Sequence, residues 1–111
     1  MTKVPLGEVI AVRDLTFINR SGIAESAKVA IGRPVMGEDE HQWWCPYRIE
    51  VPGFRKEFRM AGEDSMQALL LTVQIIKTEL EALARDQGGR FEHFGESDLG
   101  FPDINDKTTK Y

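Results

Sequence analysis

Apolar and polar residues alternate with a period of two over much of residues 8–60, which is the pattern of half-buried β-strands. The clearest case is WWCPYRIEV, residues 43–51, where every second residue from Cys45 to Val51 is apolar and the residues between them are mixed. This segment is therefore predicted to be a strand with one face in the core. Three further segments predict companion strands: EVIAVRD (8–14), AKVAIGRPV (27–35) and FRKEFRM (54–60).

The turn VPGF connects the clearest strand to FRKEFRM. Pro52 sets the φ angle of the first turn position and Gly53 supplies a positive φ at the second, so a type II turn and an antiparallel hairpin are predicted. In the returning strand, Phe54, Phe58 and Met60 are expected to face inward. EVIAVRD has apolar residues on both faces, which predicts a strand that is buried on both sides.

The period then changes to about 3.6, and GEDSMQALLLTVQIIKTELEAL, residues 62–83, predicts a long helix. Asp64 is the expected N-cap, with Gln67 placed to accept from the cap's own amide in a capping box. A glycine pair at positions 88 and 89 ends the helix, which is predicted to cover about residues 64–86. The face expected to lie on the sheet consists of Met66, Leu69, Val73, Ile76, Leu80, Leu83 and Ala84.

A second apolar strip runs along the same helix, more than about 90° from the middle of the first. Its members are Ala68, Leu71, Ile75 and Ala82. Two explanations stay open from the sequence: either the C-terminal arm folds back over Leu71 and Ile75, or a subunit or partner covers the strip. The apolar residues that the arm offers for this are Phe91, Phe94, Leu99 and Phe101.

These elements predict an α+β fold in which an antiparallel meander sheet of about four strands packs on one long helix, followed by an irregular C-terminal arm. The 111 residues are enough for one hydrophobic core, so a single domain over 1–111 is expected. Its core is expected to extend over about residues 4–102. The polar ending, residues 103–111, is predicted to be a frayed tail.

Charge and cysteine content narrow the choice of partners and compartment. The net charge of -4 disfavours nonspecific attraction to nucleic acid or anionic membranes, and residues 61–111 carry ten acidic against five basic residues. Cys45 is the single cysteine, so no internal disulfide is available and a reducing cytoplasm is the expected compartment. No apolar run approaches the roughly 20 residues of a membrane span.

The candidate catalytic and metal-binding groups form no recognisable constellation. Cys45 and His41 lie four residues apart on a strand, and burial as a small hydrophobe is the favoured reading of the cysteine. GEDEHQ, residues 37–42, contains possible metal ligands but no second ligand pair, and is interpreted as a solvated hairpin loop; His93 is likewise interpreted as a surface or partly buried histidine. A noncatalytic protein without metal or cofactor is expected, with a small enzyme that has an unrecognised pocket as an alternative.

Nucleic-acid binding is a further alternative, because the outward face of the predicted hairpin mixes an aromatic residue with cations. The residues concerned are Trp44, Arg48, Arg55 and Arg59. Glu50 and Glu57 interrupt the same face, and cross-strand ion pairs between these glutamates and the arginines are the favoured explanation. A nucleic-acid partner is therefore not favoured.

Three motifs resemble those of a family of small uncharacterised bacterial proteins. They are the Cys-Pro-Tyr strand of CPYRIEVPG, the helix start of GEDSMQALLLTVQII and the closing Gly-Phe-Pro of DLGFP, and the resemblance covers about residues 43–102. The family is similar to a domain of unknown function, so the resemblance implies no activity and no catalytic residue. Its general style, a compact sheet with one long helix, is similar to that of small immunity proteins that neutralise bacterial toxins.

Together these features predict a cytoplasmic, noncatalytic protein-binding module that acts as a homodimer or as a toxin-neutralising immunity protein. The acidic second half suits a basic partner. One of two adjacent tryptophans in a strand must point away from the core, and exposed tryptophan is enriched at interface hot spots. The predicted contact residues are Trp43, Trp44, Ala68, Leu71 and Ile75.

Overall fold

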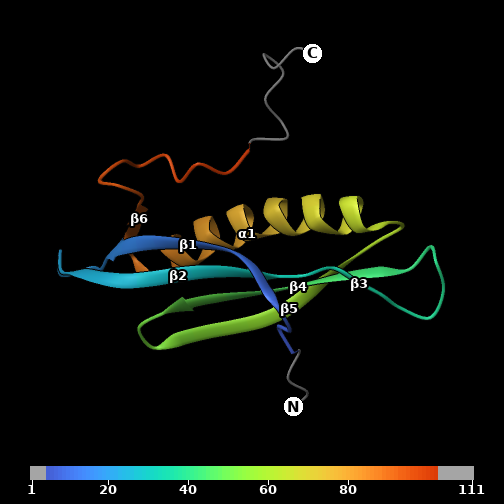
Figure 1. Cartoon of the computed structure of the whole chain (residues 1–111). Helices are drawn as coiled ribbons and strands as arrows, with labels where there is room; N and C mark the ends of the chain where they lie inside the picture. The colour runs from blue at the N-terminus through green and yellow to red at the C-terminus, as the bar shows by residue number, and fades with distance from the viewer. Residues whose placement is uncertain (1–4, 103–111) are drawn as a thin grey trace, which may run out of the picture.

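The computed structural model describes residues 5–102, which form a six-stranded antiparallel sheet and one long helix (Figure 1). The predicted frayed tail, residues 103–111, lies outside the described residues. The elements in chain order are β1 (Val9–Ile18), β2 (Ala24–Gly32), β3 (Val35–Met36), β4 (Trp43–Val51), β5 (Phe54–Gly62), α1 (Ser65–Gln87) and β6 (Arg90–Glu92).

Strands β1, β2, β4 and β5 pair antiparallel in chain order, so the predicted meander is confirmed. The two-residue β3 pairs with the start of β4, and β6 returns after the helix to pair with the end of β1. Neither short strand was predicted, because two or three residues are too few to show a period. The sheet and α1 make two layers, and the chain after β6 runs back along the helix (Figure 1).

The β4–β5 hairpin is antiparallel and has the predicted turn. Gly53 has a φ of 80°, and every second residue of β4 from Cys45 to Val51 is buried. Phe58 lies opposite Tyr47, yet it is 49% exposed, and Phe54 is also exposed. Predicting these two phenylalanines as core residues was wrong, because within residues 5–102 β5 is an edge strand and each has a strand neighbour on one side only.

Both ends of α1 are fixed by the expected capping residues. The Asp64 carboxylate accepts the Gln67 backbone N–H at 2.7 Å, while the Gln67 side chain accepts from Glu63, one residue before the amide that was predicted. At the other end Gly88 has a φ of 67°, and the Gly89 N–H donates to the Ala84 carbonyl at 3.0 Å. This is a Schellman ending, and it leads the chain directly into β6.

The buried face of α1 is rotated from the predicted one. Its fully or almost fully buried residues are Ala68, Thr72, Ile76, Leu80 and Leu83. Met66, predicted for the core, is 63% exposed. The cause lies at the end of β5: a Cβ on Gly62 would stand 2.4 Å from the Ala68 nitrogen, so the missing side chain lets Ala68 press against the strand. Within residues 5–102 no helix combines the length and apolar character needed to cross a bilayer.

Candidate functional site

The two predicted tryptophan anchors point to opposite faces of the sheet. Trp43 packs against the core, and its indole N–H donates to the Glu40 carbonyl at 3.0 Å. Trp44 lies on the outer face, where the Arg59 guanidinium stands 3.9 Å from its ring centroid. Both indoles are partly exposed and already have contacts within the chain.

The second apolar strip of α1 does not form one exposed surface. Ala68 is fully buried, and Ile75 is partly buried and packs against the core. Leu71 is partly exposed. Ala68 is therefore a core residue in this structure, and the proposed contact at Leu71 and Ile75 remains a prediction.

The C-terminal arm covers a different side of α1 from the one that was expected. β6 starts the arm beside β1, and Leu99 and Phe101 then border hollows along the flank of Val73 and Lys77. Leu71 and Ile75 lie about 160° from Val73 around the helix, so the predicted cover over them was wrong. Phe91 is buried in β6 and packs against Phe17 with the ring centroids 4.9 Å apart, whereas Phe94 is 92% exposed.

A partly buried polar cluster ties α1 to the sheet. The Tyr47 hydroxyl donates to Glu79 Oε1 at 2.7 Å, and Lys56 Nζ donates to the same oxygen at 2.6 Å. Burial of Tyr47, helped by the hydrogen bond and negative charge of Glu79, raises the pKa of the phenol far above its ordinary value. The phenol therefore stays neutral and acts as a hydrogen-bond donor, and the cluster connects α1 to β4 and β5.

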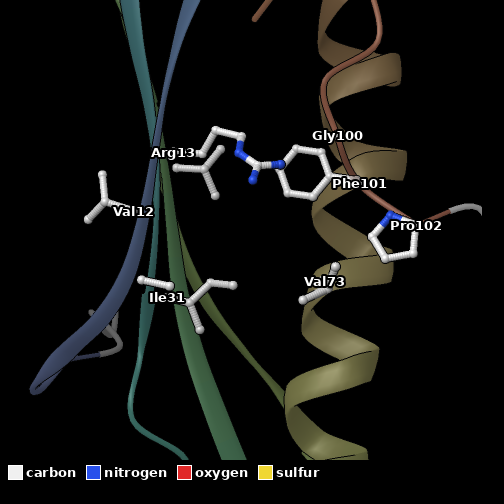
Figure 2. Close-up of a pocket in the computed structure, with 9 residues that line it drawn as sticks. Val12, Arg13, Ile31, Val73, Gly100, Phe101 and Pro102 are labelled. Carbon is white, nitrogen blue, oxygen red and sulfur yellow. The ribbon is translucent and has the colours of Figure 1, made fainter.

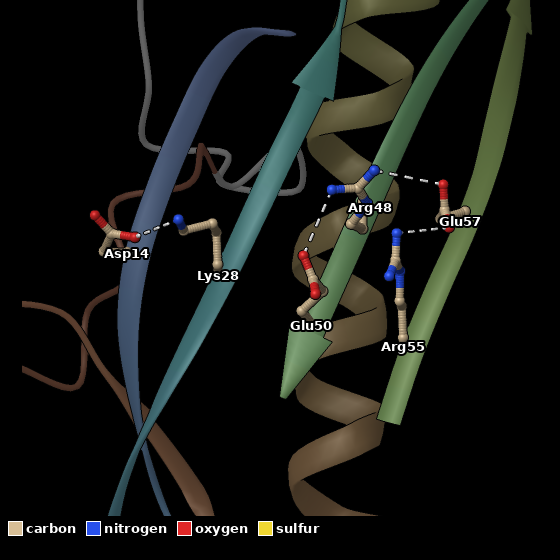
Figure 3. Close-up of polar contacts among 6 residues, drawn as sticks. All are labelled: Asp14, Lys28, Arg48, Glu50, Arg55 and Glu57. Atoms are coloured by element: carbon tan, nitrogen blue, oxygen red, sulfur yellow. Dashed lines mark ion pairs between the residues drawn. The ribbon is translucent and has the colours of Figure 1, made fainter. Parts of the chain in front are cut away.

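The outer face of the sheet carries a ladder of ion pairs (Figure 3). Arg48 lies 3.6 Å from both Glu50 and Glu57, and Arg55 lies 3.1 Å from Glu57. Lys28 on β2 faces Asp14 on β1 at 3.8 Å. The predicted pairing of arginines with glutamates on this face is confirmed, and it neutralises much of the basic character of the hairpin.

The groups considered for catalysis or metal binding lie apart. Cys45 is fully buried, as expected, and burial raises the pKa of its thiol. His41 lies in the exposed loop between β3 and β4, beside Glu40 at 3.5 Å, and His93 stands at the end of β6 against Phe94. Among residues 5–102, no three His, Cys, Asp or Glu side chains gather closely enough to hold a metal ion.

One edge of the sheet is open along the first part of β1. β2 pairs with β1 along one side, and on the other side β6 pairs only with Thr16, Phe17 and Ile18. Among the described residues, the segment from Val9 to Leu15 therefore has no strand on the side away from β2. This segment also exposes aliphatic side chains. Val9, Ile10 and Val12 are 45%, 46% and 52% exposed.

An apolar groove lies between this edge and α1 (Figure 2). It has a volume of about 260 Å³ and is lined by Ala11, Val12, Arg13, Val29, Ile31, Val73, Gly100, Phe101 and Pro102. Arg13 holds the arm at the groove: its Nη1 donates to the Leu99 carbonyl at 2.8 Å, and its guanidinium lies 5.1 Å from the Phe101 ring centroid. In Figure 2 the Arg13 and Phe101 side chains meet between β1 and the helix.

The groove and the open edge adjoin at Ala11, Val12 and Arg13, and together we call them the β1-edge surface. It consists of Val9–Leu15 of β1 and the groove beside it. The exposed Met66 and Leu70 share the helix flank of Val73, which lines the groove. Sequence reasoning missed this surface because the apolar residues on both faces of β1 were taken as a sign of double burial, and Met66 was assigned to the core.

These features define a small α+β protein with one long helix on an antiparallel meander sheet and an apolar surface along one sheet edge. Residues 11–103 match the model of the family described as Domain of unknown function (DUF6968), and the chain belongs to that family. The resemblance inferred from the CPY, GEDSMQAL and GFP motifs is thereby confirmed as a membership in a family of unknown function. No curated protein and no solved structure matched the chain.

Proposed function

We propose that this protein is a noncatalytic protein-binding module and that the β1-edge surface is its contact. The observation that carries the proposal is the open segment from Val9 to Leu15, where unpaired backbone groups coincide with three exposed aliphatic side chains. Soluble proteins usually protect such an edge with charges, prolines or a covering loop. An open edge that exposes aliphatic side chains is suited to pairing with another chain.

The other polar surfaces support this proposal over the alternatives. On the outer sheet face, Arg48 and Arg55 have carboxylate partners and Arg59 stacks on Trp44, which reduces the cationic surface available to a nucleic acid. The Tyr47–Glu79–Lys56 cluster is occupied in joining the helix to the sheet.

A charge placed on the open edge tests the proposal. The tagged full chain is used as bait in two pull-down experiments. One offers it an untagged copy of itself, and the other offers it a soluble extract of the source cells. We expect the wild type to retain at least one chain in stoichiometric amount. Val12→Lys should retain little, because lysine on an edge strand opposes pairing.

Ile23→Lys is the matched control, since Ile23 is 59% exposed but lies in the turn between β1 and β2. It should retain as much as the wild type does. Thermal unfolding of each variant confirms that it is folded. Equal retention by wild type and Val12→Lys, or retention of no chain by the wild type, would contradict the proposal.

A further inference from the structure

Phe94 is held in the open by a turn that does not suit it. The turn of residues 93–96 is closed by hydrogen bonds of 2.9 and 3.0 Å between the backbones of His93 and Glu96. Its two central residues, Phe94 and Gly95, have φ angles of 52° and 80°, as in a type I′ turn. Asparagine, aspartate and glycine tolerate such angles, whereas phenylalanine in the left-handed region is strained.

Contacts within the described chain do little to offset this backbone strain. Phe94 is 92% exposed, and the nearby ring is that of His93, at 4.3 Å between centroids. An aromatic side chain in this position contributes little to folding, because it buries almost no apolar surface. Strained, exposed aromatics of this kind are suited to a contact with another molecule.

The groove of the β1-edge surface has the size and lining that a phenyl ring needs. Its volume is about 260 Å³, and a cavity of roughly 150 Å³ lined by aliphatic and aromatic residues is enough to bind benzene. Phe94 does not fill the groove of its own chain, as its exposure shows. The groove therefore offers a place for Phe94 of another molecule.

We propose that two copies of this protein associate by inserting Phe94 of each copy into the groove of the other. This inference rests on the proposed function, and it names a second copy as the partner. The turn follows β6, which ends opposite Thr16, and the groove begins at Ala11 to Arg13 on the same strand. A twofold axis that crosses the edge between these points exchanges turn and groove, which gives a closed, isologous dimer.

Charge supports the same pairing. Glu96 and Asp98 follow Phe94 and make no ion pair among the described residues, and Arg13 lines the groove without a carboxylate partner there. Docking the acidic turn of one copy on the groove of the other brings these opposite charges together. The unpaired edges of β1 also approach each other around the axis, antiparallel as a twofold axis requires.

Sedimentation equilibrium of the full chain over micromolar to submillimolar concentrations tests the dimer. The wild type should associate, and Phe94→Asn should weaken association by roughly tenfold or more, the effect of removing an aromatic anchor. Asparagine tolerates the positive φ, so the same variant should unfold at an equal or higher urea concentration than the wild type. A merely structural role for Phe94 predicts the opposite change in stability.

Phe58→Asn is the matched control, because Phe58 is an exposed phenylalanine on the far edge of the sheet. It should leave association unchanged. A second experiment mixes Phe94→Cys chains with Ala11→Cys chains, and we expect a disulfide between the two different chains. Mixing Phe58→Cys with Ala11→Cys should give little, and Cys45 is fully buried and does not compete.

A wild type that stays monomeric throughout, or a dimer that Phe94→Asn leaves intact, overturns the inference. The retention experiment described above then distinguishes failure of the dimer proposal from failure of the proposed protein-binding function. A monomer that still retains a different protein through Val12 overturns the second-copy partner and leaves the proposed function standing. A monomer that retains nothing overturns both.

Discussion

The two flanks of α1 face the sheet in different ways. On the side of β4 and β5, the helix is joined to the strands by Tyr47, Lys56 and Glu79, and Ala68 is pressed against Gly62. On the side of β1, helix and sheet separate and leave a groove of about 260 Å³, bridged at the arm by Arg13 and Phe101 (Figure 2).

The difference shows how one amphipathic helix serves two purposes. The β4–β5 flank carries the residues with the least exposure, where burial and the hydrogen bonds to Glu79 Oε1 contribute to folding. The β1 flank exposes Met66 and Leu70 on the side of the helix that carries Val73, where apolar surface contributes little to the stability of the isolated chain. Stability should thus depend on the first flank and association on the second.

The largest effect is expected for Ile76→Ala. Ile76 is fully buried at the centre of the buried face, so its truncation should lower the free energy of unfolding by about 2–5 kcal/mol. Leu70→Ala, on the exposed part of the same helix, should change it by less than about 0.5 kcal/mol. Urea unfolding of both variants gives the comparison, and equal losses would refute the division between the two flanks.

A smaller loss is expected for Glu79→Ala. The variant leaves the buried Tyr47 hydroxyl without its acceptor, which costs roughly 1–3 kcal/mol. Glu81→Ala is the control, because Glu81 is exposed on the same helix and makes no ion pair among the described residues. If both variants unfold at the wild-type urea concentration, the cluster does not join helix and sheet as described.

Tyr47 also gives stability a dependence on alkaline pH. Its pKa is raised in the folded chain above the ordinary 10.0 by burial and by Glu79, so this contribution is complete below pH 10. Above pH 10 the unfolded chain loses the proton while the folded chain keeps it, and stability falls by up to about 1.4 kcal/mol per pH unit. Unfolding measured in pH steps should show this extra slope in the wild type and not in Tyr47→Phe; parallel profiles would contradict it.

The β4–β5 flank was largely predictable from local sequence patterns. β4 has an unbroken alternation from Cys45 to Val51, and Asp64 and the glycines after α1 mark the ends of the helix. The rotation of the helix was not predicted, although Gly62 offered a signal: a glycine at the end of a strand permits close packing against the following helix. Without this signal, the sequence does not show whether Ala68 packs on the sheet or belongs to a second apolar strip.

The β1 flank was not predictable in the same way, because it depends on contacts between segments that are distant in the sequence. β6 has three residues, and only its pairing with β1 shows on which side the arm must run. The sequence HFGE did contain a turn signal in Gly95, but the exposure of Phe94 follows from the tertiary position of that turn. Arg13 likewise meets Leu99 and Phe101 only after the sheet, helix and arm are assembled.

The smallest effect on global stability is expected for Arg13→Ala. The variant removes the donor to the Leu99 carbonyl and the cation on the Phe101 ring. Leu99 and Phe101 are only partly buried at the periphery of the core, so the free energy of unfolding should fall by less than about 1 kcal/mol. The arm should open locally while the sheet and helix stay folded. In NMR spectra the Leu99 methyl shifts should move toward unfolded values, and those of Ile76 should not change.

Arg33→Ala is the control for this change, because Arg33 is exposed and pairs with Glu8 at 3.3 Å, away from the arm. Its Leu99 methyl shifts should match those of the wild type. If Arg13→Ala moved the Ile76 methyls as far as those of Leu99, the β1 flank would be part of the same cooperative unit as the β4–β5 flank. The contrast between a folding flank and an associating flank would then fail, since opening the groove would require unfolding the core.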